Sequence, residues 1–230
     1  MFILRTSGGC SLWRKWEAMK QYLQTDLFDA QGRLAIDVGF TTAKRTVLDA
    51  QSWVEVVPCW ITGSSTLFAA LETLVPWKQH HRRLFEQTFL EPRLTAEYRS
   101  LRDVPHQALV DAAAALTTHY GVVYDNLWMN LYRNGQDSTG WHRDRFSCRR
   151  PECVVPVLTL GVKRQFLLKP RGGGRSIGFA PAAGDLIVMG GRCQEDWVHG
   201  VPKSPGILEP RISVNFQSSV QARPSRDEER

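Results

Sequence analysis

The first half of the chain carries apolar residues at helical spacing. This spacing predicts amphipathic helices over residues 12–24, 64–76 and 107–119. Ser64 and Ser65 are residue types that cap a helix N-terminus, and Pro76 is expected to end the second helix. The four consecutive alanines that begin at Ala112 favour the third helix.

The second half is built from short apolar runs separated by turn signals. The predicted strands lie at residues 127–132, 154–160, 165–168, 185–189 and 212–216, with glycine- and proline-rich turns at 170–174 and 181–184. Many short strands with helices upstream indicate an α+β fold, in which helices pack on one side of a double-stranded β-helix (jelly-roll) core.

The pattern also divides the chain into three parts. We expect residues 1–56 to form an N-terminal extension packed on the core, residues 57–218 to form the core domain, and residues 219–230 to form a flexible tail. The tail prediction rests on a composition rich in Arg, Glu and Pro from Gln221 onward.

Composition sets broad limits on the class of protein. The 230 residues are 43% hydrophobic and 23% charged, which is ordinary for a globular domain. No run approaches the roughly 18 apolar residues of a membrane span, and the apolar start at residues 1–5 is too short for a signal peptide. We therefore expect a cytoplasmic protein without a membrane partner. The sequence does not determine the oligomeric state, for which our expectation is a monomer.

Charge and cysteine content add two expectations. The net charge of +6 is compatible with a polyanionic partner such as nucleic acid, although many basic proteins bind none. The five cysteines are odd in number and form no C-x-x-C motif, so reduced thiols are expected. Cys148 and Cys153 are close in sequence, but a zinc site would need two more ligands nearby.

Three residues form a candidate metal site. His142 and Asp144 occupy alternate positions of an extended segment and so point to one face, and His199 lies downstream. Two imidazoles and one carboxylate hold Fe(II) while leaving positions open for oxygen and a co-substrate. The same set can hold zinc for hydrolysis, and H-x-D also occurs by chance on surfaces. Arg211, which opens an apolar strand, favours the oxygenase because a guanidinium can bind a carboxylate bidentately.

The amino-acid sequence around these residues identifies a protein family more specifically than their spacing does. Residues 130–144, from Asn130 to Asp144, resemble the core motif of the AlkB-like Fe(II)/2-oxoglutarate-dependent dioxygenase family. Further similar segments lie at residues 91–98, 166–174, 189–203 and 210–213, so the resemblance covers about residues 57–218.

The resemblance implies a function and a role for each site residue. His142, Asp144 and His199 would hold Fe(II), and Arg211 would pair with the distal carboxylate of the co-substrate 2-oxoglutarate, which is consumed with O2. Asn130 and Tyr132 would donate hydrogen bonds to the same co-substrate. The implied reaction is oxidative dealkylation of bases such as N1-methyladenine and N3-methylcytosine in DNA or RNA, which serves the repair of alkylation damage.

The chain departs from the family pattern at two places. The family strand carries a second arginine six residues after the first, and Gln217 stands at this position. Gln217 can donate hydrogen bonds to the co-substrate but brings no charge. Many members also carry acidic residues directly after H-x-D, where this chain has Arg145 and Phe146, and this leaves the preferred base open.

An alkylated base must leave the duplex, or be single-stranded, to reach a buried metal. Tyr98 is our choice for its aromatic platform, ahead of Phe85 and Trp77, although such residues more often pack in a core. Phosphate contacts are expected from Arg93, Lys169 and Arg171, with Lys78, Arg82, Arg83 and Arg175 as further candidates. The alternative for each basic residue is a solvated surface position.

Three functions therefore compete at the level of sequence. The first is a nucleic-acid dealkylase with an alkylated DNA or RNA partner. The second applies the same oxygenase chemistry to a protein, a lipid or a small molecule. The third is a non-catalytic relative that binds nucleic acid, which the complete triad disfavours and Gln217 leaves open.

Overall fold

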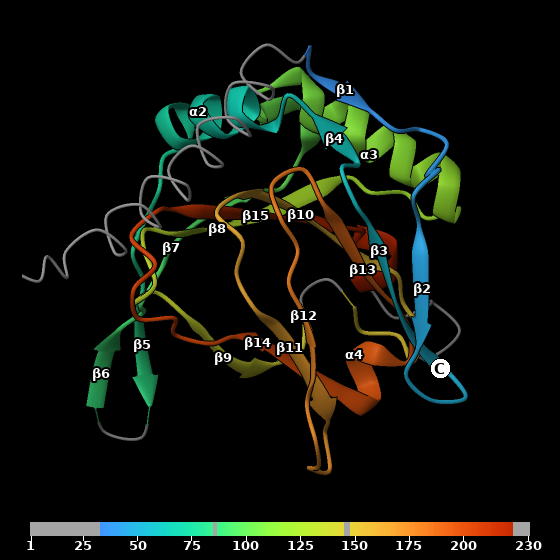
Figure 1. The fold of residues 1–230 in the computed structure, drawn as a ribbon, viewed down its shortest axis with the longest axis vertical. Coiled ribbons are helices and arrows are strands. Elements are labelled where there is room, and N and C mark those ends of the chain that lie inside the picture. Colours follow the sequence, from blue (N-terminus) through green and yellow to red (C-terminus); the bar gives the residue numbers. More distant parts are fainter. Residues whose placement is uncertain (1–32, 85–86, 145–147, 223–230) are drawn as a thin grey trace, which may run out of the picture.

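The computed structural model describes residues 33–84, 87–144 and 148–222 (Figure 1). The predicted helix at residues 12–24 lies outside the described residues. Within them, no helix has the length and apolar character that crossing a membrane requires.

Seven antiparallel strands form the major sheet, in the spatial order β2-β3-β13-β10-β15-β8-β7. Their bounds are β2 Lys44–Val47, β3 Ser52–Val57, β7 Leu94–Tyr98, β8 Asn126–Tyr132, β10 Val155–Gly161, β13 Leu186–Gly191 and β15 Arg211–Gln217. The five strands predicted from the sequence correspond to β8, β10, β11, β13 and β15, so each of them is confirmed with small shifts of its ends.

A minor sheet of four antiparallel strands lies opposite, in the order β12-β11-β14-β9 (Figure 1). Its strands are β9 Thr139–His142, β11 Phe166–Pro170, β12 Ile177–Phe179 and β14 Trp197–Val201. The two sheets form the predicted jelly-roll core. Two small pairs complete the strands: β1 Ala35–Ile36 with β4 Ile61–Thr62, and the hairpin of β5 His81–Leu84 and β6 Gln87–Leu90.

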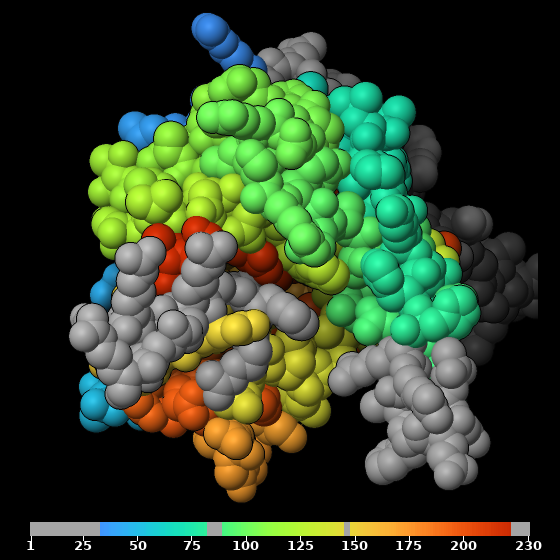
Figure 2. Space-filling view, turned by 180° about the vertical axis from the view of Figure 1, so that it is seen from behind, coloured from blue at the N-terminus to red at the C-terminus, as the bar shows by residue number. Residues whose placement is uncertain are grey.

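Helices cover one face of the major sheet, as predicted. The helix α2 spans Ser64–Leu74 and α3 spans Gln107–Tyr120, and in Figure 1 both lie above β15, β8 and β10. Seen from behind, α3 in green crosses the upper part of the molecule while the β11–β12 hairpin in orange projects at the bottom (Figure 2). Leu67, Leu71, Leu109 and Leu116 are fully buried in the core under these helices. Shorter helical segments are η1 Leu101–Asp103, α4 Cys193–Asp196 and α5 Ser219–Ala222.

Alternation along the central strands assigns residues to two environments. In β15, Ile212, Val214 and Phe216 belong to the core that the helices cover. The intervening residues Arg211, Ser213, Asn215 and Gln217 line a cavity between the two sheets. The same holds for β8, whose Leu127, Met129 and Leu131 join the helix-side core while Trp128, Asn130 and Tyr132 line the cavity.

Three boundaries in the structure differ from those predicted from the sequence. The predicted division between residues 56 and 57 falls inside β3, which pairs with β13 along its whole length, so the core domain includes β2 and β3. The predicted tail begins with α5, where Gln221 is buried and its amide contacts the Val154 main chain at 2.8 and 3.0 Å. Helix α2 begins at Ser64, so Gly63, rather than a serine, occupies the cap position.

The cysteine expectation also needs a correction. Cys148 and Cys153 are joined as a disulfide with Cα atoms 6.0 Å apart, because the turn between them brings both side chains together. Cys59 and Cys193 are free thiols, as predicted, and Cys10 lies outside the described residues.

Candidate active site

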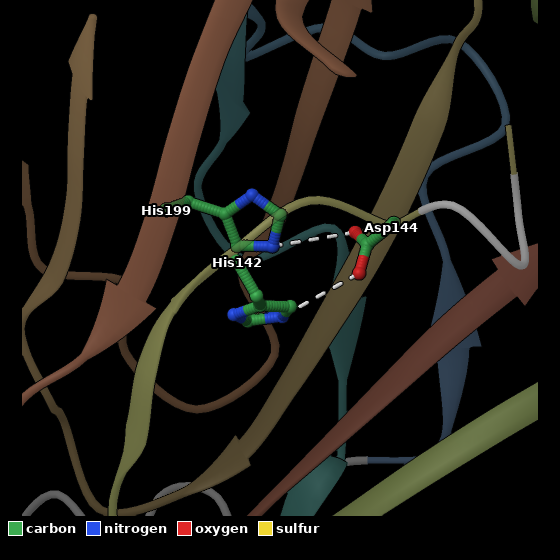
Figure 3. A group of neighbouring side chains, drawn as sticks. All are labelled: His142, Asp144 and His199. Carbon is green, nitrogen blue, oxygen red and sulfur yellow. Dashed lines mark ion pairs between the residues drawn. The ribbon is translucent and has the colours of Figure 1, made fainter. Parts of the chain in front are cut away.

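His142, Asp144 and His199 meet at one point between the sheets. The two histidines are directly opposite each other in the β9–β14 ladder, and Asp144 follows two residues after His142. The candidate ligand atoms of all three side chains lie within 4.8 Å of one another. The Asp144 carboxylate faces both rings, at 3.4 Å from Nε2 of His199 and 3.6 Å from Nε2 of His142 (Figure 3).

Each histidine is oriented by a neighbour. Nδ1 of His142 lies 2.8 Å from the Gly140 carbonyl oxygen, to which it can only donate. This bond leaves the Nε2 lone pair of a neutral His142 free to bind a metal. The ring of His199 stacks on Phe166, with centroids 5.3 Å apart.

The electrostatics of the cluster suit a divalent cation. Burial alone would raise the pKa of Asp144, but the charge of His199 and hydrogen bonds from both histidines hold this pKa well below its usual value. Burial lowers the pKa of His199. Burial also favours a neutral His142, but the hydrogen bond and charge of Asp144 outweigh it and raise the pKa of His142. A carboxylate beside imidazole nitrogens is the donor set that Fe(II) takes in oxygenases, so these residues fit that ion.

Arg211 provides a buried positive charge in the same cavity. Its side chain is 1% exposed, and Nη2 donates to the Thr159 hydroxyl at 3.0 Å. Nε and Nη1 are buried without a hydrogen-bond acceptor among the described residues. Buried donors of this kind are costly when unpaired, and the planar fork of arginine matches a carboxylate. The site therefore fits one carboxylate of a dicarboxylic co-substrate at this position.

Asn130 and Tyr132 lie on the cavity-facing side of β8, where Tyr132 is directly opposite Arg211 in the ladder. The Asn130 amide oxygen accepts hydrogen bonds from Nε of Arg93 at 2.9 Å and from Nε1 of Trp128 at 3.1 Å. Its amide nitrogen donates to Ser213 at 3.1 Å, which leaves one N–H for a ligand. The Tyr132 hydroxyl shares a hydrogen bond of 2.7 Å with Thr139.

The cavity that joins these residues has a volume of about 510 Å³. Gln217 faces it from the opposite end of β15 to Arg211, as its alternation with Arg211 requires. The remaining lining residues are His80, His81, Glu91, Gly140, Arg143, Val157, Asn215, Gly200 and Val201.

The structure does not bring Tyr98 to this cavity. Tyr98 pairs with Leu127 across β7 and β8 and packs against the helix-side core, so its ring is on the wrong face of the sheet for a bound base. Trp77 also packs against that core, and Phe85 lies outside the described residues. Trp128 lines the cavity, together with Tyr132 and Phe166. The sequence could have indicated this position of Trp128. Trp128 precedes Asn130 by two positions in a strand, so both side chains lie on the same face.

The predicted phosphate contacts divide into two groups. Arg93 turns into the cavity, where it binds Asn130 and lies 3.3 Å from the Glu91 carboxylate, so it is not an outer-surface residue. Lys169 and Arg171 lie outside: the Lys169 ammonium is 4.4 Å from the ring centroid of exposed Trp141, and Arg171 pairs with Glu195 at 3.6 Å. Lys78 and Arg175 are exposed, and the side chains of Arg82 and Arg83 are not described.

Comparison with known proteins assigns the class. Residues 66–216 match the sequence model of the 2OG-Fe(II) oxygenase superfamily, and the chain belongs to this superfamily. Membership implies Fe(II), 2-oxoglutarate and O2, for which the cavity provides the triad and Arg211.

Individual relatives point to the AlkB-like branch, as the sequence motifs predicted. Alpha-ketoglutarate-dependent dioxygenase alkB homolog 3 of Bos taurus is 30% identical over 67% of this chain and 61% of its own length. DNA oxidative demethylase ALKBH2 of Arabidopsis thaliana is 25% identical over 82% of this chain and 70% of its own. The chain thus spans about three fifths of the alkB homolog 3 relative.

A solved structure shares the fold. A 2OG-Fe(II) oxygenase family oxidoreductase from Burkholderia pseudomallei superimposes with a TM-score of 0.50 at 18% identity, over 74% of this chain and 89% of its own.

Proposed function

We propose that this protein is an Fe(II)/2-oxoglutarate-dependent dioxygenase that removes N-linked alkyl groups from bases in DNA or RNA. The observation that carries the proposal is one cavity containing both the His142–Asp144–His199 cluster and the buried, partly unpaired guanidinium of Arg211. The relatives named for nucleic-acid demethylation support the choice of polymer substrate. Bases of the N1-methyladenine and N3-methylcytosine type are the expected lesions.

Each residue then has a defined task. His142, Asp144 and His199 hold the metal, which when bound supplies oxidising chemistry from O2 and 2-oxoglutarate. Arg211 binds the distal carboxylate, and its burial excludes water from this contact. Asn130 donates its remaining N–H to the co-substrate, while Arg93 and Trp128 fix the direction of its amide.

Trp128 is our proposed contact for the target base. Tyr132 lies beneath the Arg211 guanidinium and Phe166 stacks on His199, so both of these aromatic rings are engaged deep in the cavity. Trp128 is half-buried and lines the cavity, and its indole N–H donates to the same Asn130 oxygen as Arg93. Aromatic rings stack on any base, and such contacts are worth about 1–3 kcal/mol.

The decisive experiment measures succinate formed from 2-oxoglutarate with Fe(II), with and without a panel of methylated oligonucleotides. We expect succinate production to rise with methylated DNA or RNA and the oligonucleotide mass to fall by the lost methyl group. His142→Ala should abolish both signals because it removes a metal ligand. Succinate production that no oligonucleotide stimulates would point to a protein, lipid or small-molecule substrate. An absence of turnover with intact nucleic-acid binding would favour a non-catalytic relative.

A further inference from the structure

Asp144 differs from the two histidines in how its backbone is held. His142 and His199 lie in strands β9 and β14, where they are paired directly across the ladder. Strand β9 ends at His142, so Asp144 lies beyond the ladder. Contacts outside the sheet must therefore set the position of the Asp144 carboxylate relative to the two rings.

Gln194 makes such a contact. Its side-chain oxygen accepts a hydrogen bond of 2.8 Å from the Asp144 main-chain N–H. Its side-chain nitrogen donates to the Met189 sulfur at 3.4 Å, which is a weak acceptor. Gln194 is 1% exposed, and burying an amide is costly unless its polar atoms are paired. The bond to Asp144 is thus the main polar interaction that offsets the burial of this side chain.

One continuous segment carries both Gln194 and His199. Helix α4 (Cys193–Asp196) runs directly into β14 (Trp197–Val201). The start of β14 is anchored to a distant loop, because the Trp197 indole N–H donates to the Asp49 carboxylate at 2.6 Å. The segment that supplies one ligand of the cluster therefore also holds the backbone of another.

We propose that Gln194 is a positioning residue of the metal site. It holds the Asp144 main chain so that the carboxylate faces His142 and His199 before a metal binds. Gln194 does not belong to the ligand set itself, and it acts only through Asp144. The inference rests on the metal site of the proposed function and is independent of the nucleic-acid substrate.

The test compares the metal affinity of variants by titration with Mn(II), a stand-in for Fe(II) that is stable in air. Gln194→Met keeps the size of the side chain but removes the acceptor oxygen. Loss of a group that orients a metal ligand typically weakens metal binding 10- to 100-fold, so we expect about this decrease. Gln194→Glu retains an oxygen at the acceptor position and should lose less.

Cys193→Ala is the matched control. Cys193 lies on the same helix and is equally buried, but its sulfur contacts the Trp53 carbonyl oxygen instead of Asp144. The melting temperature of the metal-free proteins separates positioning from general stability. A selective loss of Mn(II) affinity in Gln194→Met, with a melting temperature no lower than that of Cys193→Ala, supports the proposal. Native affinity in Gln194→Met, or an equal loss in Cys193→Ala, overturns it.

The same titration keeps this inference apart from the proposed function. If the native protein binds no Mn(II), the result contradicts both the proposed metal site and the role of Gln194. If it binds Mn(II), the variants decide the role of Gln194 whether or not a methylated oligonucleotide is turned over.

Discussion

At the scale of single residues, the cavity contains polar groups whose hydrogen bonds are incomplete among the described residues. Arg211 is fully buried, yet two of its nitrogen donors lack acceptors among the described residues. Burial lowers the pKa of Arg211, so holding its charge there costs free energy. A bound carboxylate would offset that cost, which makes co-substrate affinity the quantity most sensitive to this side chain.

Arg211→Ala is expected to weaken 2-oxoglutarate binding roughly 10- to 150-fold, because a charge-assisted hydrogen-bonded pair contributes about 1.5–3 kcal/mol. Arg211→Lys should recover only part of the affinity, since lysine lacks the planar fork. Calorimetric titration in the presence of Mn(II) measures both values. Arg45→Ala, on the edge strand β2, is the control and should bind as the native protein does. Unchanged affinity in Arg211→Ala would contradict the role.

Two variants of Trp128 distinguish the contribution of its aromatic ring from that of its indole N–H. Trp128→Leu removes the ring and should raise the KM for a methylated oligonucleotide roughly 5- to 150-fold, because stacking contributes about 1–3 kcal/mol per base. Trp128→Phe keeps a ring but loses the hydrogen bond to Asn130, and should raise KM much less. Leu208→Ala is the control for an exposed apolar side chain outside the cavity. Equal KM values for Trp128→Leu and the native enzyme would exclude stacking.

At the scale of elements, strand β3 shows how an apparent extension becomes part of the core. β3 pairs with β13 from Ser52 to Val57. The indole of Trp53 lies over Gly190, where a Cβ atom would overlap the ring. The guanidinium of Arg45 covers Trp53 at 3.7 Å from a ring centroid, so β2, β3 and β13 form one packed unit.

Gly190→Ala is therefore expected to destabilise the protein by about 1–3 kcal/mol through overpacking. For a chain of this size, that corresponds to a decrease in melting temperature of roughly 2–12 °C. Gly172→Ala is the matched control, since a Cβ there meets nothing within 4 Å. Thermal unfolding followed by circular dichroism measures both variants, and equal melting temperatures would show that β3 tolerates displacement from β13.

At the scale of the whole molecule, the net charge of +6 is the property that bears on a polymer substrate. Arg93 and Arg211 make their hydrogen bonds inside the cavity. We therefore expect the phosphates of the proposed substrate to contact outer residues such as Lys169 and Arg171. Such contacts release counterions and carry no base information.

We expect the affinity for a methylated oligonucleotide to fall log-linearly with rising salt. Lys169→Ala should reduce the slope of log affinity against log salt concentration by about one, which corresponds to one lost phosphate contact. It should weaken the binding of all oligonucleotide sequences equally. Trp128→Leu should leave the slope unchanged, because stacking releases no ions. Fluorescence anisotropy at several salt concentrations gives these slopes. A flat salt response would favour a substrate that is not a nucleic acid.

The sequence alone was sufficient for the fold class and for the centre of the site. Short apolar runs with turn residues between them encode strands locally, and five of them are confirmed. The triad and Arg211 were predicted from their identities, their spacing and the resemblance of the surrounding segments to a known family, and the structure brings all four residues to one cavity. Alternation also placed Asn130 and Tyr132 on one strand face, and in the structure both line the cavity.

Only the tertiary structure decided which face of each strand meets which layer. Tyr98 and Trp128 are both aromatic and both lie in strands. Trp128 shares its strand with Asn130 and Tyr132, whose alternation marks its face, whereas β7 offers no such reference for Tyr98. Arg93 was expected outside for the same reason. The hydrogen bond between Asp144 and Gln194 joins residues 50 positions apart in the sequence. Periodicity within a strand or helix cannot predict a contact of that range. Periodicity fixes the relation between neighbours in one strand, whereas the packing of layers fixes what each face touches.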